Sequence, residues 1–376
     1  MSARPVLLAA GGTGGHLFPA EALAGALAAR GLAVELATDA RAARYAGHFP
    51  ARALHVLPAE TVRARTPLAL ARTTAILGLG ILKGLNLLRR TQPQIVVGFG
   101  GYPTLPPLLA ASLLSIPTLI HESNGVMGRA NRILAGRVSA IATGFAGVTD
   151  ADPTRAAKTV RTGNPLRLTA IAAAAMPFVP PTPGGALHLL VFGGSQGARV
   201  MSEVVPAALE QLDPTARARL RLVQQARAED LSQVRAGYER LGIDAELAEF
   251  FQDLPQHMAA AHLVIARSGA STIAELSAIG RPSLLVPLPH ALDQDQTANA
   301  RALERIGAAW LMRQADFTPS ALAGHLTRLI DDPRTLTPMA NAAKSAGTLD
   351  AAERLADLVE HLGAGRSVAS FPGKLG

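Results

Sequence analysis

The sequence predicts a doubly wound α/β protein with two Rossmann-like domains that face each other across a cleft. Two observations lead to this prediction. A short buried strand followed by a glycine loop occurs twice, first at 6–15 and again at 188–197. A stretch rich in proline and glycine lies between the two copies. The alternative of one enlarged sheet would not need such a break, so two domains are favoured.

The N-terminal half alternates short apolar runs with helical patterns, which is typical of a parallel sheet covered by helices. Stretches such as Pro19–Ala29 place apolar residues three or four apart, as expected of a helix that packs on a sheet. The apolar runs predict strands at Val6–Ala10, Ala33–Ala37, Gln94–Val97, Pro117–His121 and Ser139–Ala142. Residues 1–168 are therefore expected to form the first domain.

The regular pattern is interrupted at residues 169–185, which we predict to be a linker. Pro177, Pro180, Pro181, Pro183 and the pair Gly184-Gly185 all oppose regular elements there. Residues 186–345 are expected to form the second domain. Residues 346–376 are expected to form a C-terminal helix and tail, which could pack on the first domain. Strands of the second domain are expected at His188–Phe192, Leu220–Gln224, Ala245–Phe250, Leu263–Ala266, Ser283–Val286 and Ala309–Met312.

Composition narrows the environment of the protein. The 376 residues include no cysteine, which excludes disulfides and thiolate metal sites and suits a reducing compartment. The apolar run that starts at Val6 is too short for the core of a signal peptide, so a buried strand is favoured. We therefore expect the protein to stay in the cytoplasm.

The net charge of +8 is unevenly distributed. Residues 1–165 carry a net charge of +10, whereas residues 166–376 carry −2. This asymmetry predicts an anionic surface or partner on the side of the first domain. Only 4% of the residues are aromatic, which disfavours a stacking platform for nucleic acid, so no nucleic-acid partner is expected.

Residues 67–90 form a long apolar stretch that Arg72 and Lys83 interrupt, which leaves too few consecutive apolar residues for a membrane span. Leu77, Ile81, Leu85 and Leu88 fall on one helical stripe. Such a stripe with basic neighbours suits a helix that lies on anionic lipid, and the patch at 63–90 is predicted to bind a membrane surface. A core helix with solvated ends is the equal alternative. The basic neighbours are Arg63, Arg65, Arg72, Lys83, Arg89 and Arg90.

Three glycine-containing loops that each follow a strand predict anion sites. Gly11–His16 lacks the third glycine of a dinucleotide fingerprint and the lysine of a Walker loop, so it indicates an anion without naming one. Gly193–Arg199 adds Ser195, a hydroxyl that could donate to phosphate, although a helix cap without a ligand is the alternative. In Arg267–Glu275, the carboxylate of Glu275 could accept two sugar hydroxyls; a solvated surface glutamate is the alternative, but the neighbouring Gly and Ser favour a cleft position.

Taken together, the motifs resemble the MurG family of UDP-GlcNAc transferases. The resemblance runs from residue 6 to about 355. It rests on seven motifs in the family's order: Gly11–His16 with Pro19, Gly100-Gly101-Tyr102, His121-Glu122 with Asn124-Gly125, Gly163-Asn164-Pro165 with Arg167, Gly193–Arg199, Arg267–Ala270 with Glu275, and Asp293 with Gln296, Asn299 and Ala300.

This resemblance implies a GT-B fold and a role for each matching residue. Ser195 would contact the diphosphate, Glu275 the ribose hydroxyls, and the backbone at Phe251 the uracil. Gln296 would contact the GlcNAc hydroxyls, with Asn124 and Arg167 as further donor-site residues. The loop across the cleft would be Thr13, Gly14 and Gly15, and the nucleotide loop Ala270, Ser271, Thr272, Ile273, Ala274 and Glu275. Ser123 and Asp295 depart from the family pattern, which leaves details of the sugar contacts open.

The family's reaction implies an inverting transfer of GlcNAc from UDP-GlcNAc to the C4 hydroxyl of MurNAc in lipid I, the undecaprenyl-linked acceptor of peptidoglycan synthesis. A base must accept the proton of that hydroxyl, and His16 is the first candidate because its ordinary pKa lies near working pH. A structural role for His16 is the alternative, and Glu122 is the second candidate. Helix N-termini and Ser195 would stabilise the leaving UDP. We expect no metal and no cofactor, although Asp150/Asp152 and Asp293/Asp295 form Asp-x-Asp pairs.

Three other functions compete with this interpretation. A dehydrogenase would need the missing third glycine, although Asp39 stands near the position of an acidic ribose ligand. A membrane or nucleic-acid binding module would rest on the basic half alone. A UDP-GlcNAc 2-epimerase would need neither the 67–90 segment nor the Gly100-Gly101-Tyr102 loop. The resemblance places the protein at the cytoplasmic face of the inner membrane as a peripheral enzyme.

Overall fold

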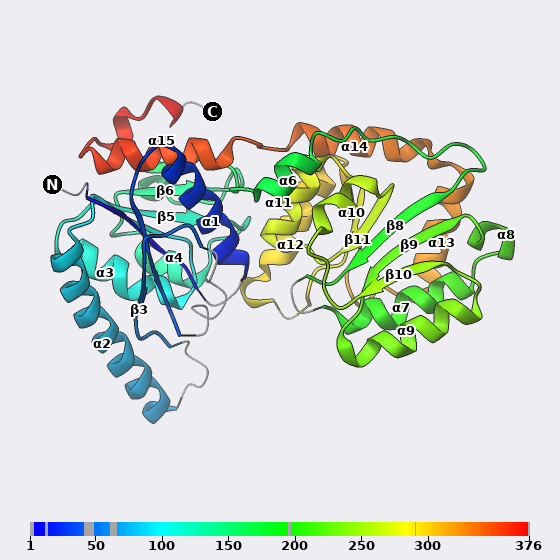
Figure 1. Ribbon diagram of the computed structural model, residues 1–376, viewed down its shortest axis with the longest axis horizontal. Helices are drawn as coiled ribbons and strands as arrows, with labels where there is room; N and C mark the ends of the chain where they lie inside the picture. The colour runs from blue at the N-terminus through cyan, green and yellow to red at the C-terminus, as the bar shows by residue number, and fades with distance from the viewer. Residues whose placement is uncertain are drawn as a thin grey trace. The chain divides into compact units, whose positions relative to one another are not determined.

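A computed structural model describes residues 4–11, 14–40, 49–60, 66–194, 197–289 and 291–374. Its contacts divide the chain into two compact units (Figure 1). Unit 1 contains Met1–Arg167 and Leu349–Gly376, and unit 2 contains Leu168–Thr348. Each unit is built on one parallel sheet, which confirms the predicted class of two Rossmann-like α/β domains.

The sheet of unit 1 has the strand order β3-β2-β1-β4-β5-β6-β7, and all of its pairings are parallel. The central strands are buried on both faces, which explains their continuous apolar sequences. The strands are β1 (Val6–Ala9), β2 (Val34–Thr38), β3 (Ala53–Val56), β4 (Ile95–Gly98), β5 (Thr118–Glu122), β6 (Ala140–Thr143) and β7 (Thr159–Arg161).

Helices cover both faces of this sheet. One core contains alternate residues of β1 together with α1 and α15, and the opposite core contains the remaining residues of β1 with α2, α3 and α4. The helices are α1 (Gly14–Ala29), α2 (Pro67–Thr91), α3 (Leu105–Leu113), α4 (Arg129–Leu134), α5 (Pro153–Ala156) and α15 (Ala351–Gly363), with short 3-10 turns η2 (Tyr102–Thr104), η5 (Val368–Ser370) and η6 (Pro372–Lys374).

Helix α15 joins unit 1 from far along the sequence. Leu355, Leu358, Val359 and Leu362 are buried in the core that α1 and β1 share. At the surface, the Arg30 guanidinium of the α1–β2 turn pairs with the carboxylates of Glu353, Asp357 and Glu360. Apolar burial supplies most of the attachment, since exposed ion pairs contribute little.

The stripe of α2 that we predicted to face a membrane faces the protein. Leu88 is 1% exposed, and Leu77, Ile81 and Leu85 are half-buried against the core beneath α2 and α3. That part of the prediction is wrong because an apolar stripe at helical spacing looks the same whether it meets lipid or a sheet. Within the described residues, no helix is both long and apolar enough to cross a membrane.

Unit 2 repeats the architecture with the strand order β10-β9-β8-β11-β12-β13, again fully parallel. Helices α7, α9 and α13 lie on one side of β8–β10, where Figure 1 shows them together, and they enclose the main core. The strands are β8 (Leu187–Phe192), β9 (Leu220–Gln225), β10 (Ala245–Ala248), β11 (Leu263–Ala266), β12 (Ser283–Leu285) and β13 (Ala309–Leu311).

The helices of unit 2 include the start of the predicted linker, because residues 168–173 form α6. They are α6 (Leu168–Ala173), α7 (Arg199–Glu210), α8 (Pro214–Arg217), α9 (Ala228–Arg240), α10 (Leu254–Ala260), α11 (Ala270–Ile279), α12 (Asp295–Arg305), α13 (Pro319–Asp331) and α14 (Leu336–Ser345), with η3 (Leu292–Gln294) and η4 (Pro333–Thr335).

Two cations attach residues 174–177 of the predicted linker to unit 2. The Arg281 guanidinium, 1% exposed, donates to the carbonyls of Met176 and Pro177 at 3.2 Å. The Lys344 ammonium donates to the carbonyl of Ala174 at 2.7 Å. The segment therefore lacks regular structure after residue 173 but is held by side chains of one unit.

Candidate functional site

The strand order of each sheet defines where a ligand should bind. In both sheets the winding reverses at the centre, between β1 and β4 in unit 1 and between β8 and β11 in unit 2. At such a switch point the connecting helices leave toward opposite faces and open a crevice at the carboxyl ends of the strands. The glycine-containing motifs at Gly11, Gly100, Gly193 and Gly269 follow these four strands.

His16 lies in the first turn of α1, not at the end of a loop, because the helix begins at Gly14. A Cβ added at Gly100 would lie 3.2 Å from the His16 Nε2, so the half-buried imidazole packs directly on the Gly100 backbone. Gly100 and Gly101 have φ angles of +89° and +77°, which favour glycine. Burial lowers the pKa of His16, so the imidazole is neutral at pH 7 and able to accept a proton.

Glu122 stands at the end of β5 and is 2% exposed. Its Oε1 accepts from the Asn124 backbone N–H at 3.0 Å and from the Asn124 side-chain amide at 3.3 Å. Its Oε2 accepts from the Gly128 N–H and the Asn131 side chain, both at 2.9 Å. Burial raises the pKa of Glu122, and these hydrogen bonds offset part of the shift. Because four donors converge on the carboxylate, it is suited to hold the 123–131 segment.

We expect Glu122→Gln to lower the stability of unit 1 by about 2–3 kcal/mol, because the new amide would face N–H groups that need an acceptor. Chemical denaturation followed by circular dichroism measures the change. Glu353→Gln is the matched control, since that carboxylate is exposed on α15 and its loss should cost less than about 1 kcal/mol. Equal midpoints for the two variants would contradict the role assigned to Glu122.

His121 has no geometry for proton transfer to a substrate. It is fully buried, its Nε2–H donates to the Gly163 carbonyl at 3.0 Å, and its Nδ1 accepts from the Ser123 hydroxyl at 3.2 Å. Burial lowers its pKa to about 4, which keeps the ring neutral. The side-chain amide of Asn164 donates to the Ser123 carbonyl at 2.9 Å. These contacts shape the segment that presents Asn124.

Arg167 is the last residue of unit 1 before α6. Its guanidinium lies over the Phe18 ring, 4.8 Å from the centroid. Phe18 is two residues beyond His16 on α1, so the structure brings Arg167 close to the helix that carries the candidate base. Thr13, another predicted site residue, lies outside the described residues, and Gly14 and Gly15 begin α1.

In unit 2 residues 267–269 connect β11 to α11, and residues 270–275 form the first turns of that helix. Helix α11 starts at Ala270 after Gly269 without a side-chain cap, so its first-turn N–H groups, from Ala270, Ser271 and Thr272, remain for an anion. Ile273 and Ala274 continue the helix. Glu275, in the second turn of α11, is 4% exposed.

A hydrogen-bond network ties this segment to Gln296 on α12. The Ser268 hydroxyl donates to the Gln296 carbonyl at 2.8 Å, and the Asn299 side-chain amide donates to the Ser268 carbonyl at 3.0 Å. The Gln296 Oε1 accepts from the Leu288 N–H at 3.0 Å. The buried Arg267 guanidinium donates to the carbonyls of 286 and 287, both at 3.0 Å. These hydrogen bonds therefore hold together the segments that follow β11 and β12 and the start of α12, all at the carboxyl edge of the sheet of unit 2.

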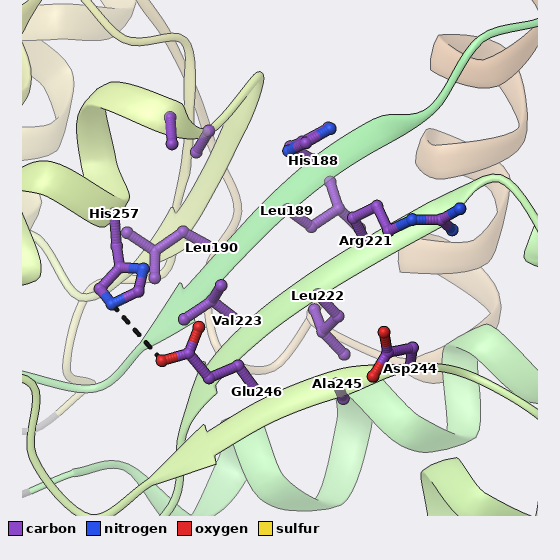
Figure 2. Close-up of a pocket in the computed structure, with 12 residues that line it drawn as sticks. His188, Leu189, Leu190, Arg221, Leu222, Val223, Asp244, Ala245, Glu246 and His257 are labelled. Carbon is purple, nitrogen blue, oxygen red and sulfur yellow. Dashed lines mark ion pairs between the residues drawn. The ribbon is translucent and has the colours of Figure 1, made fainter.

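Phe251 follows β10, and its ring is buried edge-on against His257 of α10 at 4.8 Å between centroids. His257 also lines a pocket of about 260 Å³ on the face of β8–β10, where its Nε2 lies 3.7 Å from the Glu246 Oε1 (Figure 2). None of the predicted site residues lines this pocket. Ser195 lies outside the described residues, between Gly194 and Gly197 in the sequence.

The sequence interpretation missed three residues that organise these loops: Asn131, Arg267 and Gln225. Arg267 begins the predicted motif Arg267–Ala270, but the sequence indicated no function for its side chain. Asn131 lies between two arginines in α4 (RANRIL), and Gln225 ends β9 (LRLVQQ) directly after Gln224, so neither amide stood out in the sequence. Buried side-chain amides need hydrogen-bond partners, and here the backbone groups of the neighbouring loops provide them.

The chain is similar to known glycosyltransferases along most of its length. Residues 6–143 match the glycosyltransferase family 28 N-terminal domain, and residues 188–355 match the family 28 C-terminal domain. A Rhodopseudomonas palustris (strain BisA53) protein is 59% identical over 369 residues, covering 98% of this chain and 97% of that protein. A Bradyrhizobium sp. (strain BTAi1) protein is 58% identical, with coverage of 95% and 98%. Both are named UDP-N-acetylglucosamine–N-acetylmuramyl-(pentapeptide) pyrophosphoryl-undecaprenol N-acetylglucosamine transferase.

Solved structures agree on the fold. The crystal structure of Acinetobacter baumannii MurG superimposes with a TM-score of 0.78 at 28% identity and covers 95% of this chain and 99% of its own. A putative UDP-N-acetylglucosamine 2-epimerase from Listeria monocytogenes reaches 0.68 at 15% identity, with coverage of 97% and 98%. The second likeness concerns the fold alone.

Proposed function

The chain belongs to glycosyltransferase family 28 and, within it, to the MurG transferases, and from this membership we infer that it transfers N-acetylglucosamine from UDP-GlcNAc to lipid I. The observation that carries this inference is the similarity of both domains, end to end, to relatives named for that reaction. The fold is of the GT-B type. The product is the β-1,4-linked disaccharide of lipid II, so the anomeric carbon inverts in one displacement.

The geometry supports His16 as the base of this displacement. A neutral imidazole accepts the proton of the acceptor C4 hydroxyl as that oxygen attacks the anomeric carbon and the bond to UDP breaks. The lowered pKa of His16 keeps it in the accepting form at neutral pH. Glu122, Asn131 and Asn124 hold the neighbouring backbone in place.

The departing UDP carries the charge that develops in the transition state. The open first turn of α11 offers backbone N–H groups for that charge, and the family resemblance implies a like role for the glycine loop after β8. Gln296 and Phe251 are proposed to contact the sugar and the uracil, and Glu275 the ribose. As the family resemblance implies, Ser195 is proposed to contact the diphosphate, and Thr13 to belong to the glycine loop of unit 1.

Transfer of labelled GlcNAc from UDP-GlcNAc to a soluble lipid I analogue, with UDP release measured in parallel, tests the function. Equal amounts of disaccharide product and UDP are the expected result. Consumption of UDP-GlcNAc without acceptor would instead indicate epimerase or hydrolase chemistry. Absence of both turnover and UDP binding would contradict the function altogether.

We further propose that unit 1 docks on the anionic cytoplasmic face of the cell inner membrane through α2. The outward side of this helix exposes Leu79 (48%) and Leu82 (65%) one turn apart. Lys83, Arg89 and Arg90 follow on exposed positions, and α2 contains no acidic residue. Apolar side chains bordered by cations suit a helix that rests in the interfacial region of anionic lipid.

We expect Leu79→Glu combined with Leu82→Glu to weaken sedimentation with vesicles of phosphatidylglycerol and phosphatidylcholine at least about tenfold. The double change removes apolar contact and adds repulsion from anionic lipid. Val179→Glu combined with Ile306→Glu is the matched control, since both residues are exposed and belong to unit 2. Equal binding by the two double variants would overturn the proposed surface.

A further inference from the structure

Gln225, the last residue of β9, lies between the two loops that are proposed to receive UDP. Strand β9 has β8 on one side and β10 on the other. The glycine loop follows β8, and the segment that contains Phe251 follows β10. A side chain at the end of β9 can therefore reach both loops. Gln225 is 6% exposed, so its amide must find protein partners.

Both ends of the Gln225 amide are bonded to backbone groups of these loops. Its Oε1 accepts from the Gly193 N–H at 3.1 Å, and its Nε2 donates to the Glu249 carbonyl at 3.1 Å. A carboxamide carries an acceptor oxygen and a donor nitrogen on the same carbon, which matches one N–H and one carbonyl on the two loops. A carboxylate would keep the first bond and lose the second, and a thioether would lose both.

The two backbone segments are otherwise closely constrained. A Cβ at Gly193 would lie 2.2 Å from the Ala198 backbone nitrogen, so the loop folds back on itself where Gln225 contacts it. On the other side, Phe251 is two residues beyond Glu249 and packs on His257. A bridge between such loops fixes the spacing between them.

We propose that Gln225 is a positioning residue of the donor site, holding the backbone that receives the diphosphate at a set distance from the backbone that receives uracil. This inference rests on the proposed function, because it needs UDP-GlcNAc as the ligand. Gln225 acts through Gly193 and Glu249 and does not itself touch the reacting atoms. Its loss should weaken donor binding in ground state and transition state alike.

The neighbouring residue provides a matched control. Gln224 is fully buried on the same strand, but its side chain meets α9, where its Oε1 accepts from the Tyr238 hydroxyl. Gln224→Met therefore removes a buried amide and a hydrogen bond without touching either loop. Both Gln224→Met and Gln225→Met should lower the Tm, so stability alone does not separate them.

The experiment compares steady-state kinetics with UDP-GlcNAc and a soluble lipid I analogue. For Gln225→Met we expect the KM for UDP-GlcNAc to rise about tenfold, as the loss of two hydrogen bonds implies, with kcat within about threefold. The KM for the acceptor should not change, and the Kd of UDP by calorimetry should rise with the donor KM. For Gln224→Met the donor KM should stay within about twofold.

A second variant covers the case in which Gln225→Met does not fold. In Gln225→Glu the carboxylate still accepts from Gly193 but repels the Glu249 carbonyl, whereas the protonated acid donates to it. Burial of this position, 6% exposed, should raise the pKa of the new carboxyl above its ordinary value of about 4.3. The ratio of the donor KM of Gln225→Glu to that of the wild type should therefore fall as pH is lowered from 8 to 5. A pH-independent ratio, or equal donor KM values for Gln225→Met and Gln224→Met, would overturn the proposal. Failure of the wild type to bind UDP or transfer GlcNAc would instead overturn the proposed function.

Discussion

His16→Ala is expected to lower kcat about a thousandfold, because general-base catalysis by a positioned imidazole contributes roughly 10²–10⁴. The ring packs on the Gly100 backbone and is neutral at pH 7. Its removal leaves only water to accept the proton of the acceptor hydroxyl. The KM for UDP-GlcNAc should change little, since His16 is not among the residues proposed to contact the donor. Transfer to the soluble lipid I analogue measures both constants.

The pH profile of the same variant gives an independent check. Below its pKa, His16 is protonated and cannot accept a proton, so the activity of the wild type should fall at acid pH. Burial lowers the pKa of His16 from 6.5, so this fall should begin below pH 6.5 and activity should be level above it. His16→Ala should lack the acid limb, while Glu122→Gln should keep it. Retention of a tenth of kcat by His16→Ala would exclude it as the base.

Arg281→Met is expected to lower the stability of unit 2 by about 3 kcal/mol, which corresponds to roughly 6–12 °C in Tm. The Arg281 Nε and Nη2 donate to the Ala259 carbonyl at 3.0 and 2.6 Å, and its Nη1 donates to the carbonyls of Ile279 and Gly280 at 2.9 and 3.1 Å. Burial lowers its pKa to about 10, so it remains charged at pH 7. Methionine would leave these carbonyls and those of residues 176 and 177 without a donor.

Thermal and urea unfolding measure this loss. Arg240→Met in the same unit is the control, because its guanidinium is exposed and lies 3.6 Å from the Glu210 carboxylate. That exposed pair should contribute less than about 1 kcal/mol. If the two variants unfold at the same midpoint, the carbonyl contacts of Arg281 do not stabilise unit 2.

The central strands could be predicted from sequence because their apolar runs are continuous. Leu263–Ala266 was predicted at its observed bounds, and most other strands within one or two residues. The edge strands β3 and β7 were missed. In β3, Leu54 and Val56 are exposed while Ala53 and His55 are half-buried, so no apolar run marks the strand. Edge strands are shielded less by neighbours, and their sequences resemble loops.

The candidate site could be predicted as a set of loops but not as a geometry. Glycine motifs after strands mark the switch points because doubly wound sheets bind ligands there. That four donors surround Glu122 depends on Asn124, Gly128 and Asn131 folding back together, which spacing alone does not encode. The apolar stripe of α2 is a second example. Helical periodicity predicts which residues share one face of the helix, but whether that face contacts lipid or protein depends on tertiary packing.

The place of α15 in unit 1 has a consequence for synthesis on the ribosome. Unit 2 is encoded by one continuous stretch of the chain, whereas unit 1 is encoded by two stretches with unit 2 inserted between them. The core around β1 includes Leu355, Leu358, Val359 and Leu362. The nascent first domain must therefore keep an apolar face uncovered until the second domain has been translated. The domain that starts first is thus the one completed last, and chaperones have that interval in which to protect it.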